Sequence, residues 1–312
     1  MSDQRASDEV TALGCGWAAP GISQGRHDMK VYLMTDLEGV AGVLNFEDWC
    51  TPQSRYYEMA KEFLTEEVNA AVAGFYAAGA TSVLVADGHG YGALNPKLLD
   101  PRAELLRGWA TSWPLGLEEG YDLIAWVGQH AKARTPCAHL AHTQGFNYLD
   151  LSINGVSIGE FGQLAMCASE LGIRAVFASG DKAFSEEARA LVTGIEAVAV
   201  KRGNRPGTGD ECGAETYGKR NLGAIHLQPE LARARIREGA ERAVRRARTE
   251  SFGLIPLKAP FERAALFRGK DGSGRTISRE SHPTSVIALM GMPFKPGPLA
   301  PDDPALRRLT DG

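Results

Sequence analysis

The chain has 312 residues, of which 44% are hydrophobic and 23% are charged, and its formal net charge is −4. This length and composition predict a soluble globular protein with a well-buried core, and the small negative charge argues against nucleic acid as a partner. No apolar run approaches the roughly 20 residues that a membrane-spanning helix needs, so we expect no contact with a membrane either.

The first 28 residues show no hydrophobic periodicity. A secretory signal needs an apolar run after a basic start, whereas this stretch lacks such a run and carries Asp3, Asp8 and Glu9. We therefore predict a flexible extension, or an over-long start ahead of Met29.

The five cysteines form no CxxC pair and are odd in number, which favours a reducing compartment and hence the cytoplasm.

From Met29 onward, predicted strands alternate with predicted helices. The long helix shows apolar residues at intervals of about 3.6 and ends at Gly79. Asn154-Gly155 lies between two strand-like runs, which is a strong hairpin signal. The expected strands are 30–35, 81–86, 121–127, 148–153, 156–158, 175–178 and 197–201, and the expected helices are 56–78, 161–171 and 185–191. This alternation predicts an α/β fold with a mostly parallel sheet flanked by helices.

The pattern changes near residue 203. A loop rich in Gly, Pro and Asp is predicted over 202–213, then an arginine-rich helix over 229–249 and a weak strand over 285–290. We expect a smaller C-terminal α+β portion here. The predicted organisation is a flexible extension over 1–28, an α/β domain with the functional site over 29–205, and the smaller portion over 206–312.

Acidic and histidine side chains stand at the carboxyl ends of the expected strands. Asp36 and Glu38 follow the first strand, His89 the second and His130 the third, while Glu160 begins a helix after the hairpin. Because ligands of α/β sheets bind at the carboxyl ends of strands, we expect these five side chains to converge. Oxygen and imidazole ligands without sulfur suit zinc, manganese or cobalt, and five are enough for two ions if one carboxylate bridges them.

Each of these residues also has a structural interpretation. Asp36 and Glu38 are compatible with a strand-end turn or a helix cap, His130 with a core histidine, and Glu160 with a first-turn carboxylate that the helix dipole stabilises. Two classes of protein other than an amide hydrolase also fit the cluster. One is a two-metal phosphoesterase, which the absence of a phosphate-binding glycine-rich loop disfavours, and the other is a metal-stabilised binding protein without catalysis.

The ordered set of motifs resembles the M55 peptidases, a family of D-aminopeptidases. The matching segments are KVYLMTDLEGVAGV (30–43), TEEVNAAVAGFYAAGATSVLVADGHG (65–90), GQHAKARTP (128–136), LAHTQGF (140–146), INGVSIGEFG (153–162) and SGDK (179–182). The resemblance implies two zinc ions bridged by Asp36, with Glu38 and His89 completing one site and His130 and Glu160 the other. It also implies that His142 is catalytic.

The resemblance further implies removal of N-terminal amino acids, in the D configuration, from short peptides or amides by a metal-activated water, and assembly into ring-like homo-oligomers. Non-peptide amides are the alternative substrates. The residues leave open whether His142 acts as nucleophile, acid/base or oxyanion stabiliser. The segments 204–222 and beyond Gly269 fit the family poorly, so the resemblance implies less about substrate choice than about metal binding.

Overall fold

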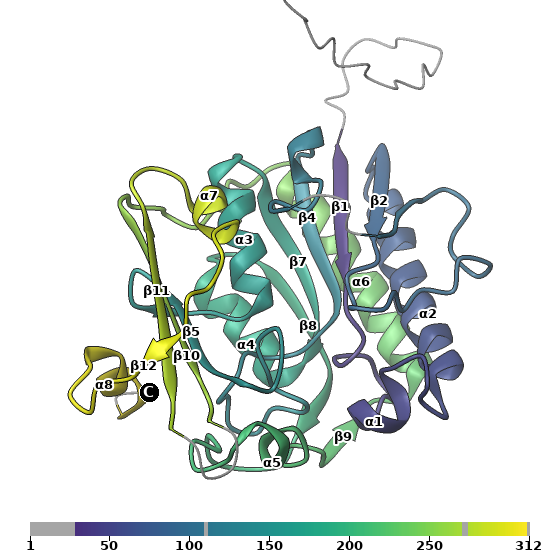
Figure 1. The fold of residues 1–312 in the computed structure, drawn as a ribbon. Helices are drawn as coiled ribbons and strands as arrows, with labels where there is room; N and C mark the ends of the chain where they lie inside the picture. Colours follow the sequence, from purple (N-terminus) through teal and green to yellow (C-terminus); the bar gives the residue numbers. More distant parts are fainter. Residues whose placement is uncertain (1–28, 109–111, 270–273, 311–312) are drawn as a thin grey trace, which may run out of the picture.

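The computed structural model describes residues 29–108, 112–269 and 274–310, so the predicted extension over 1–28 lies outside the described residues. Figure 1 shows a large sheet with helices on both faces and a smaller sheet at its side. The large sheet has the order β3-β2-β1-β4-β7-β8-β9. Its strands are β1 (Lys30–Thr35), β2 (Ser82–Ala86), β3 (Glu104–Leu106), β4 (Leu123–Gln129), β7 (Arg174–Asp181), β8 (Glu196–Gly203) and β9 (Ala224–His226).

All neighbouring strands of this sheet run parallel except β8 and β9, which are antiparallel. Helices α2 (Tyr57–Ala77) and α6 (Pro229–Ala247) cover one face, and α3 (Glu160–Glu170) and α4 (Lys182–Leu191) cover the other. The remaining helices are α1 (Phe46–Trp49), the short 3₁₀ turn η1 (Leu117–Glu119), α5 (Ala214–Gly218), α7 (Val286–Met290) and α8 (Pro304–Thr310).

Strand β1 shows why the sheet is buried on both faces. Val31 and Leu33 point into the core beneath α2 and α6, whereas Tyr32 and Met34 point into the core beneath α3. Successive side chains of a strand alternate between faces, so an uninterrupted apolar run fits a strand that helices cover on both sides. The mostly parallel α/β fold predicted from the sequence is confirmed.

The smaller sheet is antiparallel and has the order β12-β11-β10-β5-β6. Its strands are β5 (Tyr148–Ile153), β6 (Val156–Ser157), β10 (Phe261–Phe267), β11 (Thr276–His282) and β12 (Gly297–Pro298). The predicted hairpin joins β5 to β6, and its turn residues Asn154 and Gly155 have φ values of 48° and 81°. Asn and Gly adopt such left-handed angles most readily, so the turn chemistry matches the fold.

The predicted strand over 285–290 is wrong, because this segment forms helix α7. The Ser285 side chain caps it by accepting from the Ala288 amide at 3.0 Å, and Glu170 of α3 accepts from the amides of Val286 and Ile287 at 2.6 and 3.1 Å. A carboxylate from another helix satisfies the free amides of the first turn, and this contact is invisible in the local sequence.

The two sheets are interleaved along the chain. Strands β5 and β6 lie between β4 and β7 in the chain but belong to the smaller sheet. Strand β9 and helix α6 follow residue 205 in the chain but pack with the large sheet. The domain boundary near residue 205 stays a prediction.

Among the described residues, no helix combines the length and the apolar character needed to cross a membrane.

Candidate metal centre

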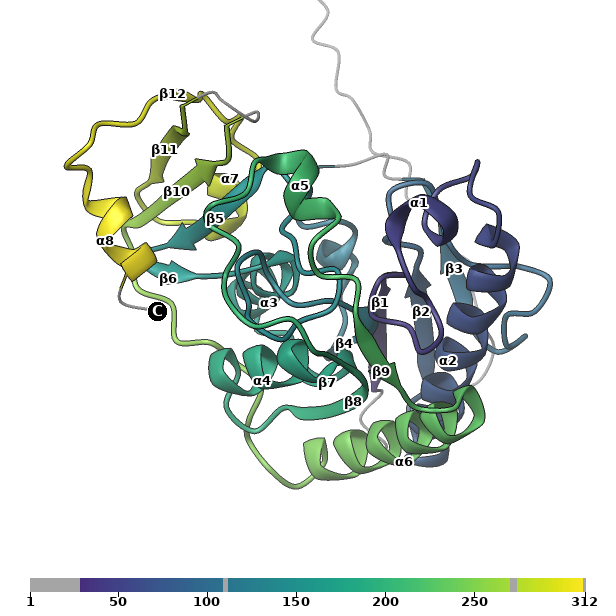
Figure 2. The same cartoon turned by 90° about the horizontal axis from the view of Figure 1, so that it is seen from below.

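Three adjacent strand ends position the predicted ligands. Strand β1 lies between β2 and β4 in parallel register, so the segments that follow these three strands meet at one edge, which faces the viewer in Figure 2. Gly128 permits the close approach of β4 to β1: it has φ +79°, and a Cβ here would lie 2.0 Å from the Asp36 carbonyl oxygen. Any larger residue would push the strand ends apart.

All five predicted ligands lie together, with Asp36 at the centre. Asp36 Oδ1 is 3.2 Å from His89 Nδ1, and Asp36 Oδ2 is 3.2 Å from His130 Nε2. Glu38 Oε2 is 3.2 Å from His89 Nδ1, and Glu160 Oε1 is 3.6 Å from His130 Nε2. Each oxygen of Asp36 therefore faces a different histidine, and each of these histidines lies near a second carboxylate, as a bridge between two cation sites requires.

Hydrogen bonds fix the orientation of the two histidine rings. His89 Nε2 lies 2.7 Å from the Cys50 carbonyl oxygen, and His130 Nδ1 lies 2.9 Å from the Ala131 carbonyl oxygen. A ring nitrogen that donates to a carbonyl carries the proton and leaves the other nitrogen free to bind a metal. The amide of Gln129 donates to Asp36 Oδ2 at 2.8 Å. The sequence reasoning missed Gln129, although it directly precedes His130.

The buried position of the cluster strongly perturbs its ionisation. Burial alone raises the pKa of Asp36, but the adjacent His130 and His89 rings hold it well below its usual range. Burial alone lowers the pKa of His89, yet Glu38 and Asp36 raise it to about 12. Against the effect of burial, the pKa of Glu160 is likewise lowered, chiefly by His130. Buried carboxylates that keep their charge need positive charge beside them for compensation.

Two buried atoms of the cluster have no hydrogen-bond partner among the described residues, namely Glu38 Oε2 and His130 Nε2. A buried polar atom without a partner costs roughly 1–3 kcal/mol, and both of these atoms point at the other ligands. Two sets of three metal-binding side chains are close enough to share an ion: Asp36, Glu38 and His130 form one, and His130, His142 and Glu160 the other. The donor set therefore fits divalent metal ions of the zinc type.

His142 lies beside the five ligands. Its ring stacks on the ring of His130 with centroids 3.8 Å apart, and its Nε2 lies 3.9 Å from Glu160 Oε1. Its Nδ1 is 2.7 Å from the Leu140 carbonyl oxygen, which places the proton on Nδ1. Burial, with His130 close by, lowers the pKa of His142. The neutral ring thus presents an unprotonated Nε2 towards the cluster.

Three buried polar side chains outside the ligand set have structural contacts. Asp87 accepts from the Ala93 amide at 2.7 Å and pairs with Arg107 at 3.1 Å, so it stabilises a turn. His139 Nε2 is hydrogen-bonded to the Leu44 carbonyl at 2.7 Å. Lys201 is buried and donates to main-chain carbonyls of the segment after Asp36, including that of Val40 at 2.9 Å.

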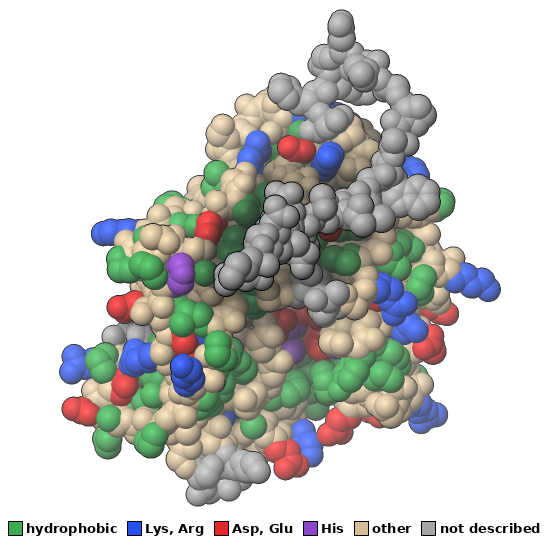
Figure 3. Space-filling view, turned by 45° about the horizontal axis from the view of Figure 1, so that its top comes forward, with side chains coloured by type: hydrophobic (Ala, Val, Ile, Leu, Met, Phe, Trp, Pro, Cys, Tyr) green, Lys and Arg blue, Asp and Glu red, His purple; other side chains and the backbone are tan. Residues whose placement is uncertain are grey.

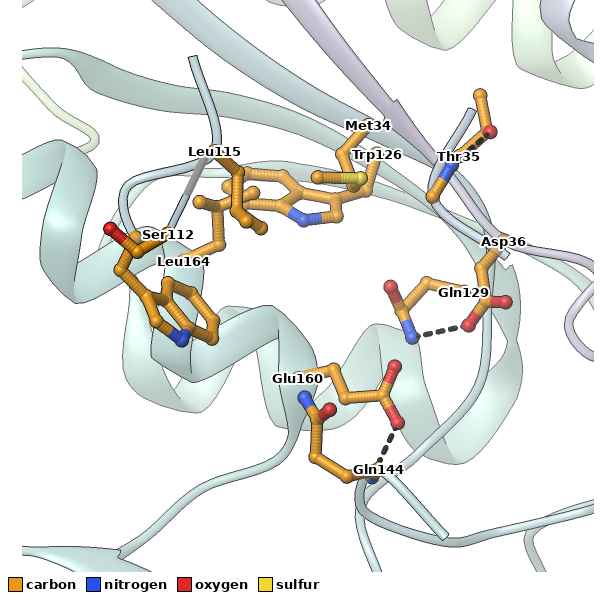
Figure 4. A pocket seen from close by; sticks show the side chains of 12 residues that line it. Met34, Thr35, Asp36, Ser112, Leu115, Trp126, Gln129, Gln144, Glu160 and Leu164 are labelled. Carbon is orange, nitrogen blue, oxygen red and sulfur yellow. Dashed lines mark hydrogen bonds between the residues drawn. The ribbon is translucent and has the colours of Figure 1, made fainter. Parts of the chain in front are cut away.

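Two cavities flank the cluster. One, of about 370 Å³, is drawn in Figure 4, where Asp36, Gln129 and Glu160 face a group of apolar side chains. The other, of about 470 Å³, is lined by His89, Tyr91, His142 and their neighbours. Figure 3 shows one face of the molecule, on which Lys and Arg side chains are spread among acidic ones. Neither cavity has Lys or Arg among the described residues that line it.

The model of the M55 peptidase family, described as D-aminopeptidase, matches residues 29–272. The chain belongs to the M55 peptidases. This match confirms the resemblance seen in the ordered motifs and establishes the chain as a metallo-aminopeptidase of the D-aminopeptidase family. A search of curated proteins finds no match.

A solved structure shares the fold of this M55 peptidase. It is the Zn-dependent D-aminopeptidase DppA from Bacillus subtilis, described as a self-compartmentalizing protease. The two chains are 23% identical and superpose with a TM-score of 0.71, covering 85% of this chain and 95% of DppA.

Proposed function

We propose that this M55 peptidase uses two zinc ions to remove the N-terminal amino acid, in the D configuration, from short peptides and amides. The observation that carries the proposal is the central position of Asp36, whose two oxygens face His89 and His130 at 3.2 Å each. Membership of the D-aminopeptidase family and the zinc dependence of DppA support the reaction and the metal.

In this proposal Asp36 contributes one oxygen to each site. Glu38 and His89 complete the first site, and His130 and Glu160 complete the second. Bound zinc supplies a water made acidic enough to ionise near neutral pH and a Lewis acid for the substrate carbonyl. The same oxygen and nitrogen ligands also accept manganese or cobalt.

We assign proton transfer to His142. Its Nδ1 proton is held by the Leu140 carbonyl, so Nε2 is the atom that takes up a proton and gives it to the departing amine. The stacked ring of His130 and the Glu160 carboxylate hold the imidazole next to the ligands. A neutral resting state suits this role, because the lowered pKa of His142 leaves Nε2 unprotonated before reaction.

The test is release of free amine from matched D-alanyl and L-alanyl amides by zinc-loaded protein. We expect cleavage of the D-alanyl amide that requires zinc and that is lost in Asp36→Ala. Faster cleavage of the L-alanyl amide would contradict the assigned stereochemistry. No cleavage of either amide, with two ions bound per chain, would contradict the aminopeptidase proposal itself.

We also propose that the chain assembles into a closed homo-oligomer in the cytoplasm. Support for the oligomer comes from DppA, which is described as self-compartmentalizing. Support for a reducing compartment comes from the described cysteines Cys50, Cys137, Cys167 and Cys212, all of which are free thiols. Light scattering during gel filtration should give a mass several times 33.5 kDa, and a monomer at working concentration would contradict the assembly.

A further inference from the structure

We infer that the 370 Å³ cavity beside the metal centre receives a large, uncharged apolar side chain on the N-terminal residue of the substrate, such as that of leucine or phenylalanine. The inference rests on the proposed function and specifies its substrate class. The cavity shares Asp36 and Glu160 with the candidate metal centre, so a side chain that enters it belongs to a residue whose carbonyl lies at the metals.

The wall opposite the carboxylates is apolar and aromatic apart from the exposed Ser112. Figure 4 shows Met34, Leu115, Trp126 and Leu164 grouped on that side of the cavity, and Trp113 also lines it. Aromatic and aliphatic walls favour a ligand that removes much apolar surface from water. A methyl group leaves most of this volume to water, whereas a branched or aromatic side chain contacts the wall.

The floor of the cavity belongs to the protein core. Trp126 and Leu164 are 1% and 2% exposed, and Met34 is 7% exposed. The cavity therefore ends against the core beneath α3, and a peptide chain cannot continue through it. A cavity that is closed on its core side fits the side chain of a terminal residue, whereas the second cavity, which includes the 62% exposed Tyr91, fits the departing part of the substrate.

Contacts behind the wall fix its shape. The Trp126 ring packs edge-on against Phe161 of α3 with centroids 4.6 Å apart. The hydroxyl of Tyr32 donates to the Leu115 carbonyl oxygen at 2.6 Å, which holds the segment carrying Trp113 and Leu115 over the cavity. A wall held in this way is formed before the substrate arrives, so little ordering free energy opposes binding.

The charges around the cavity exclude ionised side chains. Asp36 and Glu160 are its charged lining groups among the described residues, and both face the metal centre. Within the described part of the chain, no lysine or arginine lines the cavity to pair with an acidic side chain, and no carboxylate stands at its apolar end for a basic one. An ionised side chain would lose its hydration there without compensation.

The experiment compares kcat/KM for the amides of D-alanine, D-leucine, D-phenylalanine, D-glutamate and D-lysine with zinc-loaded protein. We expect the leucine and phenylalanine amides to exceed the alanine amide by at least ~10-fold, and the two charged amides to fall below it. Trp113→Ala should lower the phenylalanine-to-alanine ratio by about 10-fold. Leu164→Phe fills the cavity and should lower the same ratio.

The matched control is Leu171→Phe, which makes the same change at the exposed end of α3, where the leucine is 41% exposed. It should leave the ratio as in the wild type. Binding of D-phenylalaninamide and D-alaninamide, followed by tryptophan emission, gives a second readout, because two tryptophans line the cavity.

The outcomes separate this inference from the proposed function. Metal-dependent cleavage with the alanine amide preferred, or a ratio unchanged in both Trp113→Ala and Leu164→Phe, would overturn the inference and leave the aminopeptidase intact. Absence of cleavage for every amide would contradict the proposed function. Tighter binding of D-phenylalaninamide than of D-alaninamide would then still support the pocket, and equal binding would overturn it.

Discussion

At the residue scale, the proposed chemistry depends on the Asp36 carboxylate, which would be shared between the two metal sites. Asp36 is buried, its oxygens face two histidines, and Gln129 donates to it from the side. Such a residue has no replacement of equal charge and length. An amide in its place keeps the shape but removes the negative charge from both sites.

We predict that Asp36→Asn lowers kcat/KM more than about 100-fold and reduces bound zinc below two ions per chain, because both sites lose a ligand. Elemental analysis after gel filtration measures the zinc content. Asp100→Asn is the control, since Asp100 pairs with Arg102 away from the cluster. An Asp36→Asn protein that retains two ions and the wild-type rate would refute the bridging role.

For His142→Ala we predict a different combination of effects. All five proposed ligands remain, so both zinc ions should stay bound, while kcat falls by about 10²–10⁴ because the proton-transfer group is gone. Single-turnover rates together with zinc content separate the two effects. Loss of zinc with the rate would assign His142 to metal binding, in keeping with its place near His130 and Glu160, and a near-wild-type rate would remove it from the mechanism.

At the element scale, the segment after β1 is held by groups from two other elements. Lys201 of β8 donates to the carbonyls of Val40 and Val43 at 2.9 and 3.3 Å. Glu67 of α2 accepts from the Ala41 amide at 2.9 Å. These contacts fix the turn that carries Glu38, so the ligand geometry depends on how α2 and β8 pack against β1.

Glu67 gives this arrangement a measurable pH dependence. Burial raises the pKa of Glu67 to about 7 from an ordinary value of 4.5. Between these values the folded protein binds more protons than the unfolded chain, so this group stabilises the fold below pH 4.5 and the contribution is lost as the pH rises through 7. The full change is about 3 kcal/mol, from 1.36 kcal/mol for each pKa unit.

We therefore predict that the free energy of unfolding of Glu67→Gln, relative to that of the wild type, increases between pH 4.5 and pH 7.5. The glutamine side chain is neutral at every pH, so the variant protein cannot lose stability through ionisation at this position. Urea unfolding of both proteins at several pH values measures the difference. Parallel profiles over this range would show that Glu67 ionises normally in the folded protein.

At the scale of the whole molecule, the smaller sheet contains a buried ion pair. Arg263 of β10 and Glu280 of β11 are direct partners in the antiparallel register, with Nε and Oε2 3.0 Å apart. The guanidinium also donates to the carbonyls of Met290 and Met292 and stacks over Phe294. One side chain thus connects β10 to β11 and to the segment after α7.

We predict that Glu280→Gln lowers the free energy of unfolding by about 3–5 kcal/mol, because it leaves the Arg263 charge buried without its counterion. The control is Glu241→Gln on α6. Its ion pair with Arg245 is exposed and should contribute less than about 1 kcal/mol. Equal effects of the two substitutions in urea unfolding would contradict the importance of burial for this pair.

The sequence by itself determined strands β1, β2, β4, β7 and β8 of the large sheet, and it placed Asp36, Glu38, His89 and His130 after the carboxyl ends of β1, β2 and β4. The edge strands β3 and β9 were not expected from the sequence. Apolar runs with the periods of strands and helices are local, and parallel neighbours place their carboxyl ends at one edge. Residues directly after those strands were therefore expected at one edge of the sheet, and the order β2-β1-β4 in the folded chain brings them together. The hairpin at Asn154 was predictable for the same reason, because its turn geometry depends on two adjacent residues.

Only the tertiary structure decided the smaller sheet, helix α7 and the apolar cavity. Strand β5 pairs with β10 more than 100 residues away in the chain, as for Leu151 with Ala265, and Glu170 caps α7 from another helix. Likewise, Trp113 and Leu164 meet beside Asp36 only after three elements have packed. Local periodicity reports the conformation of a segment, whereas the choice of partner depends on the free energy of packing the whole chain.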